Sequence, residues 1–401
     1  MHAQRLLVKP ITLQSFLGVS KESGIRFLKS RVKVNCLSFF RSRQNMKLLH
    51  VVGARPNFPK LAPVHRAAKK RGLEQIIVHT GQHYDESLSE TFFRSLEIPA
   101  PTYNLEVGSA SHAVQTAMIM QRLEPIFVET RPNWIMVYGD VNSTLAAALV
   151  ASKLGILAAH VESGLRSYDR RMPEEINRMV VDRISDLLLT PSTEASTTLL
   201  NEGEAPSKIA FVGNVMIDSL FYSLPLARQT EHLKCLNVEP HVAVIVTLHR
   251  PSNVDDSARL KKIAVALREI ATERPVLFSV HPRTQLQIEK GKIDLSGVRL
   301  LPPLGYLEML CLIDGAFAVV TDSGGIQEET TALGVPCFTV RDTTERPITI
   351  TQGTNLLVPD PAILPASVRN AKRTTCPSRP DGWDGSAGPR IIDALFSFSA
   401  V

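Results

Sequence analysis

Three acidic residues in the first half of the chain stand where acid–base chemistry could use them. Asp140 and Glu162 each follow a short apolar run, and Glu174 follows a proline at a predicted helix start. Any one of them alone is explained by a helix cap, by the helix dipole or by an ion pair with Arg166 or Arg178. Three acids that converge on one edge of a sheet are better explained by proton transfer between a general acid and a general base.

Two histidines hold similar places in the second half of the chain. His249 and His281 both end apolar runs, so we predict that they face one cleft. They stand 32 residues apart on separate predicted strands, and the sequence has no HExxH spacing. We therefore expect no metal site.

A glycine-rich segment, TDSGGIQEE at residues 321–329, follows another apolar run and opens a predicted helix. The free backbone N–H groups of a helix start bind phosphate, and glycines let a diphosphate come close. We therefore predict a nucleotide site at Ser323, Gly324 and Gly325, with Glu329 able to bind ribose hydroxyls. The simpler alternative is N-capping by Asp322 or Ser323, which does not explain the paired glycines.

Basic residues follow two further apolar runs. Arg55 and Lys60 come after the first predicted strand, where a dinucleotide-binding GxGxxG is absent. Arg341 and Arg346 flank two acids in the run RDTTERP. All four can bind a phosphate group or a developing anion. A solvated surface loop for the first pair and an ion-paired loop for the second are the alternatives.

Apolar runs alternate with amphipathic stretches from Met46 onward. This alternation predicts parallel sheets with helical crossovers, here two Rossmann-like doubly wound α/β domains that face a cleft. The predicted strands are Leu48–Val52, Gln75–His79, Trp134–Tyr138, Leu157–Val161, Leu187–Thr190, His241–Thr247, Val276–Val280, Val298–Leu301, Ala316–Thr321 and Val335–Val340. The predicted helices include Ser143–Leu154, Ala258–Ala271, Gly325–Leu333 and Arg390–Phe398, and the stretch Leu224–Pro240 is predicted to be irregular.

Charge and composition set the limits of these domains. Residues 1–45 hold nine basic residues and one acid, whereas the remainder holds 36 basic and 38 acidic residues. We predict an extension at residues 1–45, disordered or a start-site artefact, an acid-bearing domain at 46–222, a nucleotide-binding domain at 223–373 and a loop with a last helix at 374–401. The balanced charge of the body gives no reason to expect nucleic-acid binding.

Five cysteines without CxxC spacing argue against a disulfide framework and favour a reducing, cytoplasmic location. No apolar run approaches the ~20 residues that cross a bilayer, so we expect no membrane anchor.

Taken together, nine runs in one order resemble the bacterial non-hydrolysing UDP-N-acetylglucosamine 2-epimerases. The runs are GARPNFPK, GQHYD, YGDVNSTLA, HVESGLRS, MPEEINR, GNVMID, TLHRPSNV, TDSGGIQEE and RDTTERPIT. The resemblance extends from Met46 to about Asp360. It implies a glycosyltransferase-B-like fold, a UDP-sugar substrate, a homodimer, no cofactor and a place in cell-surface polysaccharide biosynthesis.

The resemblance also implies roles for individual residues. Catalytic positions of the family match Asp140, Glu162, Glu174 and His249. Contacts to UDP match Arg55, His281, Ser323 and Glu329, and Lys60 matches a lysine near the substrate.

The activity implied is interconversion of UDP-N-acetylglucosamine and UDP-N-acetylmannosamine through a glycal and free UDP. The alternatives are a 2-epimerase for a related UDP-2,3-diacetamido sugar acid, a hydrolysing epimerase, a glycosyltransferase of this fold and a UDP-sugar sensor. A glycosyltransferase needs at most one base and a sensor needs none, so the surplus of acids argues against both.

Overall fold

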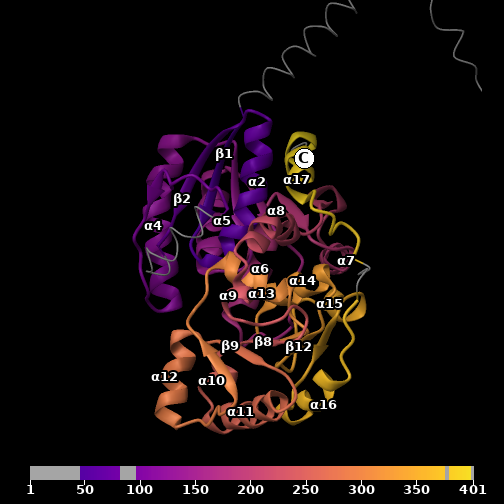
Figure 1. Ribbon diagram of the computed structural model, residues 1–401. Helices are drawn as coiled ribbons and strands as arrows, with labels where there is room; N and C mark the ends of the chain where they lie inside the picture. The colour runs from indigo at the N-terminus through magenta and orange to yellow at the C-terminus, as the bar shows by residue number, and fades with distance from the viewer. Residues whose placement is uncertain (1–45, 82–95, 375–378, 399–401) are drawn as a thin grey trace, which may run out of the picture. The chain divides into compact units, whose positions relative to one another are not determined.

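The computed structural model describes residues 46–81, 96–374 and 379–398, and all of them belong to one compact unit. The predicted extension at residues 1–45 lies outside the described residues. A seven-stranded sheet comes first, with strand order β3-β2-β1-β4-β5-β6-β7 and parallel pairing throughout (Figure 1). Its strands are β1 (Lys47–Val52), β2 (Glu74–His79), β3 (Tyr103–Asn104), β4 (Trp134–Tyr138), β5 (Leu157–Val161), β6 (Leu187–Thr190) and β7 (Ile209–Phe211).

Helices connect these strands. They are the 3-10 turn η1 (Arg55–Asn57), α2 (Phe58–Lys70), α4 (His112–Thr130), α5 (Asn142–Leu154), α6 (Pro173–Ile184), α7 (Thr193–Asn201), η2 (Pro206–Lys208) and α8 (Val215–Gln229).

A six-stranded sheet follows, also parallel, with strand order β10-β9-β8-β11-β12-β13. Its strands are β8 (Val244–Thr247), β9 (Val276–Ser279), β10 (Val298–Leu301), β11 (Ala318–Thr321), β12 (Cys337–Thr339) and β13 (Asn355–Leu357). Its helices are α9 (His232–Cys235), α10 (Pro251–Val254), α11 (Ser257–Ala271), α12 (Pro282–Gly291), α13 (Tyr306–Asp314), α14 (Gly324–Leu333), α15 (Ile348–Thr351), η3 (Pro361–Ile363) and α16 (Leu364–Arg369).

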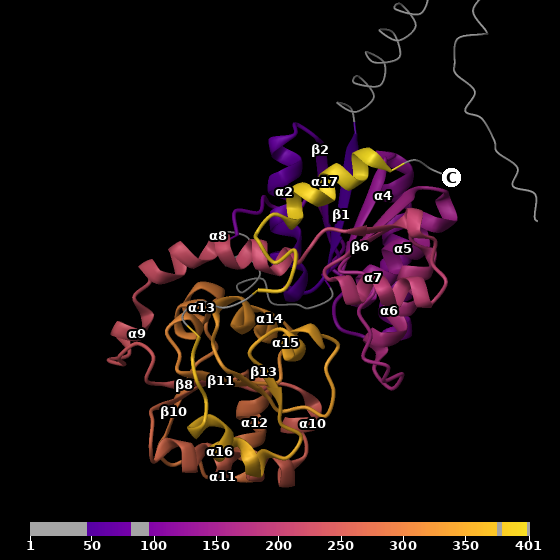
Figure 2. The same ribbon diagram turned by 90° about the vertical axis from the view of Figure 1, so that its right-hand side faces the viewer.

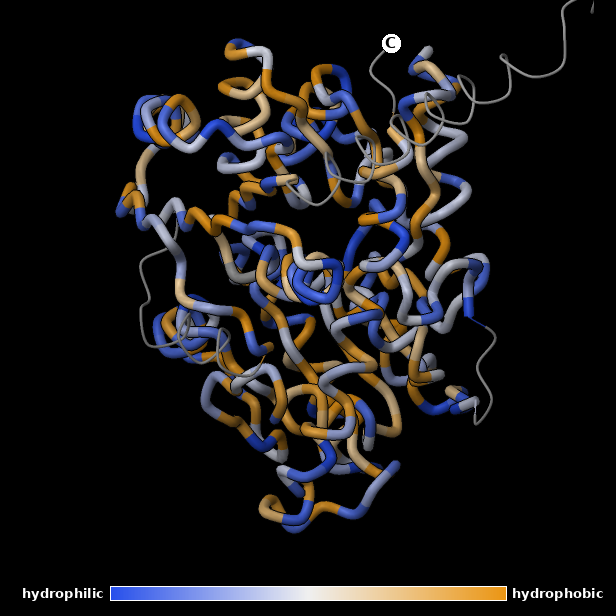
Figure 3. Tube along the Cα trace, turned by 90° about the horizontal axis from the view of Figure 1, so that it is seen from above, coloured by the Kyte–Doolittle hydropathy of each residue, from blue (hydrophilic) through white to orange (hydrophobic). Residues whose placement is uncertain are grey.

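The central strands are buried on both faces, which explains their continuous apolar runs. Along β4, Trp134, Met136 and Tyr138 belong to one hydrophobic cluster, and the alternate residues Ile135 and Val137 belong to another. Successive side chains of a strand point to opposite faces, so each face of the sheet carries its own core. In Figure 3 the outer helices alternate between hydrophilic and hydrophobic segments, as helices with one buried face do.

The prediction of two parallel α/β sheets is confirmed, and every strand named from the sequence is present within a few residues. Three strands were missed, namely β3, β7 and β13. All three are two or three residues long and lie at the edges of their sheets, where one side of the strand is solvated. Such strands carry too little buried surface to leave an apolar run in the sequence.

Two other predictions need correction. The stretch Leu224–Pro240 is not irregular throughout, because α8 continues across Pro225 to Gln229 and α9 follows. Strand β8 begins at Val244 rather than His241, whose φ of 63° is incompatible with an extended strand. The predicted domain limits 46–222, 223–373 and 374–401 stay a prediction.

The last helix, α17 (Ala387–Ser397), packs beside α2 against the first sheet, as Figures 1 and 2 both show. Ile391, Ile392 and Leu395 of α17 lie in the same hydrophobic cluster as residues of α2. The carboxylate of Asp218 on α8 accepts the backbone N–H groups of Ala387 (3.0 Å) and Gly388 (2.8 Å) at the start of α17. Since these N–H groups have no partner within the helix, Asp218 fixes where α17 begins.

Within the described residues, no helix is long and apolar enough to cross a membrane.

Replacing Ile391 by alanine should lower the free energy of unfolding by about 2–5 kcal/mol, because it leaves a cavity under a fully buried side chain. Urea unfolding followed by the fluorescence of Trp134 and Trp383 measures this loss. The matched control is Ile363→Ala, since Ile363 is 47% exposed and should change stability by less than ~1 kcal/mol. An equal loss in both variants would contradict the packing of α17 described here.

Candidate active site

The site is built on two turns that follow neighbouring strands of the first sheet. Gly139 and Asp140 follow β4, and Glu162 follows β5, which pairs with β4. Gly139 has φ 64° and Glu162 has φ 74°, both in the left-handed region. A glutamate there costs on the order of 1–3 kcal/mol, and such strain persists only when the surrounding structure holds it.

The carboxylate of Glu162 is buried between two cations from distant parts of the chain. One oxygen contacts the ammonium of Lys60 on α2, and the other lies 3.2 Å from Nη2 of Arg346. Burial alone raises the pKa of Glu162, but Lys60 and Arg346 outweigh burial and hold this pKa below its ordinary value. Glu162 is therefore an ionised carboxylate in a dry environment.

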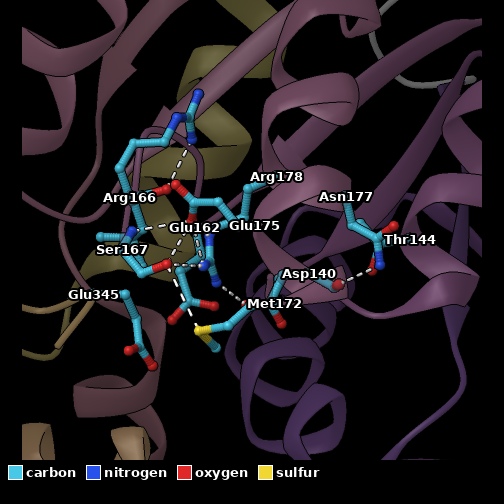
Figure 4. Close-up of polar contacts among 12 residues, drawn as sticks. Asp140, Thr144, Glu162, Arg166, Ser167, Met172, Glu175, Asn177, Arg178 and Glu345 are labelled. Carbon is cyan, nitrogen blue, oxygen red and sulfur yellow. Dashed lines mark hydrogen bonds and ion pairs between the residues drawn. The ribbon is translucent and has the colours of Figure 1, made fainter. Parts of the chain in front are cut away.

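Asp140 and Glu175 share the guanidinium of Arg178, which lies between them (Figure 4). Glu175 also accepts the backbone N–H groups of Ser167 and Tyr168. These bonds occupy both carboxylate oxygens of Glu175, which is therefore an ion-paired residue of the helix start. Glu174 is half-buried in the first turn of α6, one position earlier, and Asp140 keeps 30% of its side chain exposed.

His249 follows β8 in the second sheet and is oriented by a buried acid. Its Nδ1 lies 3.0 Å from Oδ1 of Asp322, and 41% of its side chain is exposed. Asp322 also accepts the backbone N–H groups of His249 and Arg250 and the side-chain amide of Asn253. Burial raises the pKa of Asp322, but the bonds from His249, Asn253 and the backbone of Arg250 together outweigh burial and hold this pKa below its ordinary value.

The two N-capping alternatives for the glycine-rich segment are wrong in this structure. The carboxylate of Asp322 accepts backbone N–H groups of the loop after β8. Ser323 occupies the N-cap of α14 without a side-chain capping bond. A Cβ on Gly324 would lie 2.5 Å from Nη1 of Arg346, so a larger residue there would displace this guanidinium from its ion pairs. A Cβ on Gly325 would meet Met216 at an ordinary 3.6 Å, so packing alone does not require that glycine.

Arg346 connects the second sheet to the first. Its guanidinium pairs with Glu328 on α14 (3.0 Å), with Glu345 (2.5 Å) and with Glu162. Arg341 pairs with Glu345 as well, at 2.9 Å. For residues 341–346 the structure therefore shows the ion-paired loop, which was the alternative left open by the sequence.

Arg55 and His281 are the remaining predicted residues. Arg55 belongs to η1, directly before the helix that carries Lys60. His281 is the exposed N-cap of α12, and its ring centroid lies 6.2 Å from that of His249. The structure thus brings His249 and His281 together, and it brings Lys60, Glu162 and Arg346 together.

An open groove of about 620 Å³ passes beside this site. It is lined by residues 167–169, 171, 172, 250–252, 259 and 341–343. Asp140, Glu162 and Glu174 do not line it, whereas Arg250 and Arg341 do and also reach the buried Glu345. The groove therefore leads from the surface toward the charged centre.

Sequence reasoning missed two partners of the site. Asp322 was considered only as an alternative helix cap, although β8 and β11 are paired with Thr247 opposite Thr321, which places the residues after both strands side by side. Asn214 was not singled out, although its amide donates to Glu328 at 2.9 Å. Strand order would have revealed the first partner, and the motif GNVMID contains the second.

Within the described residues, no group of three or more His, Cys, Asp or Glu side chains is arranged to hold a metal ion.

The two parallel sheets and the acid-rich centre between the strand ends define a glycosyltransferase-B-like enzyme architecture. Residues 65–396 match the family model described as UDP-N-acetylglucosamine 2-epimerase. A UDP-N-acetylglucosamine 2-epimerase of Methanocaldococcus jannaschii is 42% identical over 87% of this chain and 99% of that protein. A UDP-2,3-diacetamido-2,3-dideoxy-D-glucuronate 2-epimerase of Pseudomonas aeruginosa is 44% identical over 78% of this chain and 88% of that protein.

A solved structure agrees with this likeness. The crystal structure of the M. jannaschii UDP-GlcNAc 2-epimerase in complex with UDP-GlcNAc and UDP has a TM-score of 0.80 and 41% identity, and the match covers 87% of this chain and 99% of that chain. The chain belongs to the UDP-N-acetylglucosamine 2-epimerase family, and it is an epimerase, that is, an isomerase.

Glu329 on α14 makes the stability of the folded protein depend on pH. Burial raises its pKa to about 7, against a hydrogen bond from Tyr306 that lowers it. The unfolded chain releases this proton near the ordinary pKa of about 4.5, whereas the folded chain keeps it until about pH 7. Glu329 should therefore reduce stability progressively as pH rises from about 4.5 to about 7, by roughly 3 kcal/mol in all.

Glu329→Gln cannot ionise, so it should lose less stability than the wild type between pH 5 and pH 8. Urea unfolding at both pH values measures the difference. Glu124→Gln, on an exposed position of α4, should follow the wild type. If Glu329→Gln also follows the wild type, the carboxyl of Glu329 is already ionised at pH 5.

Proposed function

We propose that this chain interconverts UDP-N-acetylglucosamine and UDP-N-acetylmannosamine as a non-hydrolysing 2-epimerase. The observation that carries the proposal is the buried, ionised Glu162 between Lys60 and Arg346. A base and two cations side by side suit a reaction that removes a proton and releases a diphosphate. Relatives named for UDP-GlcNAc, including one solved with UDP-GlcNAc and UDP, support the choice of substrate.

The chemistry of the sugar sets the mechanism. No carbonyl lies next to C-2, so its proton is not acidic enough for direct removal. When the bond from C-1 to the UDP oxygen breaks, the electron pair leaves with UDP and positive charge develops on the ring. A base then takes the C-2 proton, and C-1 and C-2 form the double bond of 2-acetamidoglucal.

The reverse step inverts C-2. A proton is delivered to the opposite face of C-2, and the UDP oxygen returns to C-1. Inversion therefore needs two acid–base groups on opposite faces, for which we propose Asp140, Glu162 and Glu174. His249, held by Asp322, is the fourth group with a role in catalysis.

Release of UDP requires stabilisation of the developing diphosphate charge. We propose that Arg55, Lys60, His281, Ser323, Gly324, Gly325, Glu329 and Arg346 hold UDP. Arg346 pairs with Glu162, so a bound diphosphate would draw its guanidinium away from that carboxylate. Since Arg346 lowers the pKa of Glu162, this shift would make Glu162 a stronger base at the moment when UDP is bound.

We further propose that the protein works in the cytoplasm as a homodimer and supplies a sugar for cell-surface polysaccharide. Light scattering coupled to size-exclusion chromatography tests the dimer.

Incubation with UDP-N-acetylglucosamine in D₂O, read by proton NMR, tests the reaction. The product should be the 2-epimer, it should carry deuterium at C-2, and UDP and 2-acetamidoglucal should leak out slowly. Accumulation of free N-acetylmannosamine would show a hydrolysing enzyme. Turnover only of the UDP-2,3-diacetamido sugar acid would assign the other substrate, and a product that retains protium at C-2 would rule out the mechanism.

Asp140→Asn, Glu162→Gln and Glu174→Gln each test the acids in the same assay. Each should lower turnover by about 10²–10⁴-fold, the usual contribution of a general acid or base. UDP binding should survive in all three. Full activity in any one of them would remove that acid from the set.

Ser323→Ala should weaken UDP binding by about 0.5–3 kcal/mol, because it removes one hydroxyl donor at the start of α14. Calorimetric titration with UDP measures the change. Ser257→Ala is the matched control, since Ser257 is the exposed first residue of another helix, α11, which Asp256 caps. Equal UDP affinity in the wild type and in Ser323→Ala would refute this assignment.

A further inference from the structure

His160 is a fully buried histidine on β5, two residues before Glu162. Its Nδ1 lies 2.6 Å from Oδ1 of Asp182, and its Nε2 lies 2.8 Å from the backbone carbonyl oxygen of Gly139. A carbonyl oxygen only accepts hydrogen bonds, so Nε2 is a donor. The ring therefore connects a carboxylate on α6 to the turn that carries Asp140.

Asp182 is also buried, and its second oxygen contacts the other acid-bearing turn. Oδ2 accepts the backbone N–H of Gly164 at 3.1 Å, two residues after Glu162. The same oxygen pairs with Arg166 at 2.7 Å, so the carboxylate is satisfied on both sides. A Cβ on Gly164 would lie 2.4 Å from the carbonyl oxygen of Ala195, which shows how closely this turn is packed.

We propose that His160 and Asp182 form a positioning pair that fixes the spacing between the turn of Asp140 and the turn of Glu162. The inference rests on the proposed function and deepens it, because those two acids are proposed to transfer the proton at C-2. His160 and Asp182 do not contact the reacting atoms. They act through the carbonyl of Gly139 and the N–H of Gly164.

The chemistry of the pair supports positioning over simple stabilisation. Replacing a buried polar pair by apolar residues of similar volume often leaves a fold as stable or more stable, so the use of such a pair here points to a geometric purpose. The turn of Glu162 also holds left-handed backbone at a residue that is not glycine, which neighbouring contacts must maintain. One pair of side chains supplies a contact to each turn.

Two substitutions of His160 separate the two contacts. The amide of His160→Gln can replace Nε2 and keep the bond to Gly139, whereas the amide of His160→Asn can replace Nδ1 and keep the bond to Asp182. We expect His160→Asn to lower kcat about 10–100-fold, because it releases the turn of Asp140, and His160→Gln to lower kcat less. KM and the Kd of UDP should stay within about threefold in both, since the two partners of His160, Asp182 and Gly139, are not among the residues proposed to hold UDP.

His50→Asn is the matched control. His50 is also fully buried in the first sheet, and its ring nitrogens contact Tyr138 Oη (2.7 Å) and Gln75 Oε1 (3.1 Å). This variant also removes a buried imidazole ring, but it changes no contact to either acid-bearing turn. The kcat of His50→Asn should therefore equal that of the wild type. A loss of kcat in His50→Asn equal to that in His160→Asn would overturn the proposal, and so would wild-type kcat in His160→Asn.

A second measurement is independent of activity. Amide hydrogen exchange of peptides that cover residues 139–143 and 160–166 should be at least tenfold faster in His160→Asn than in the wild type or in His50→Asn. Asp182→Asn, which keeps the shape of the side chain, serves if His160→Asn does not fold and should show the same faster exchange. Unchanged exchange would refute the positioning pair, whereas an inactive wild type with the expected exchange would refute the proposed function alone.

Discussion

An ionised carboxylate cannot be buried alone, and the burial of Glu162 organises the centre of this protein. Lys60 comes from the helix after the first strand, and Arg346 comes from a loop of the second sheet. Taking these charges out of water is costly, so each must keep its partners. The pairing of Glu162 therefore constrains the position of α2 and of the loop after β12 at the same time.

The parallel sheets explain why chemistry can gather here. In a parallel sheet all strands end on one edge, and the residues that follow neighbouring strands lie side by side. Asp140 follows β4 and Glu162 follows β5, while His249 follows β8 and Asp322 follows β11. The position of each of these two pairs thus depends on strand order, which brings together residues that are far apart in the sequence.

Near each of the two sheets a buried carboxylate contacts the imidazole ring of a histidine. Asp322 holds His249, which is partly exposed, and Asp182 holds His160, which is fully buried. The same pairing serves two purposes, because exposure decides what the ring can reach. His249 is open to the surface, whereas His160 reaches only Asp182 and the carbonyl oxygen of Gly139.

The sequence by itself determined the strand and helix order and the residues that follow each strand. Those features are local, because apolar periodicity and glycine-rich turns depend on neighbours within a few residues. It also identified Asp140, Glu162, His249 and Ser323 as residues that end strands or open helices.

Only the tertiary structure decided which charge pairs with which. Arg346 and Glu162 are 184 residues apart, and the sequence offered Arg166 or Arg178 as equally good partners for an acid. Arg178 pairs with Asp140, and Arg166 pairs with Asp182, a residue that no local pattern distinguishes. Ion pairing depends on the distance between side chains, and that distance is set by the packing of helices and sheets rather than by position along the chain.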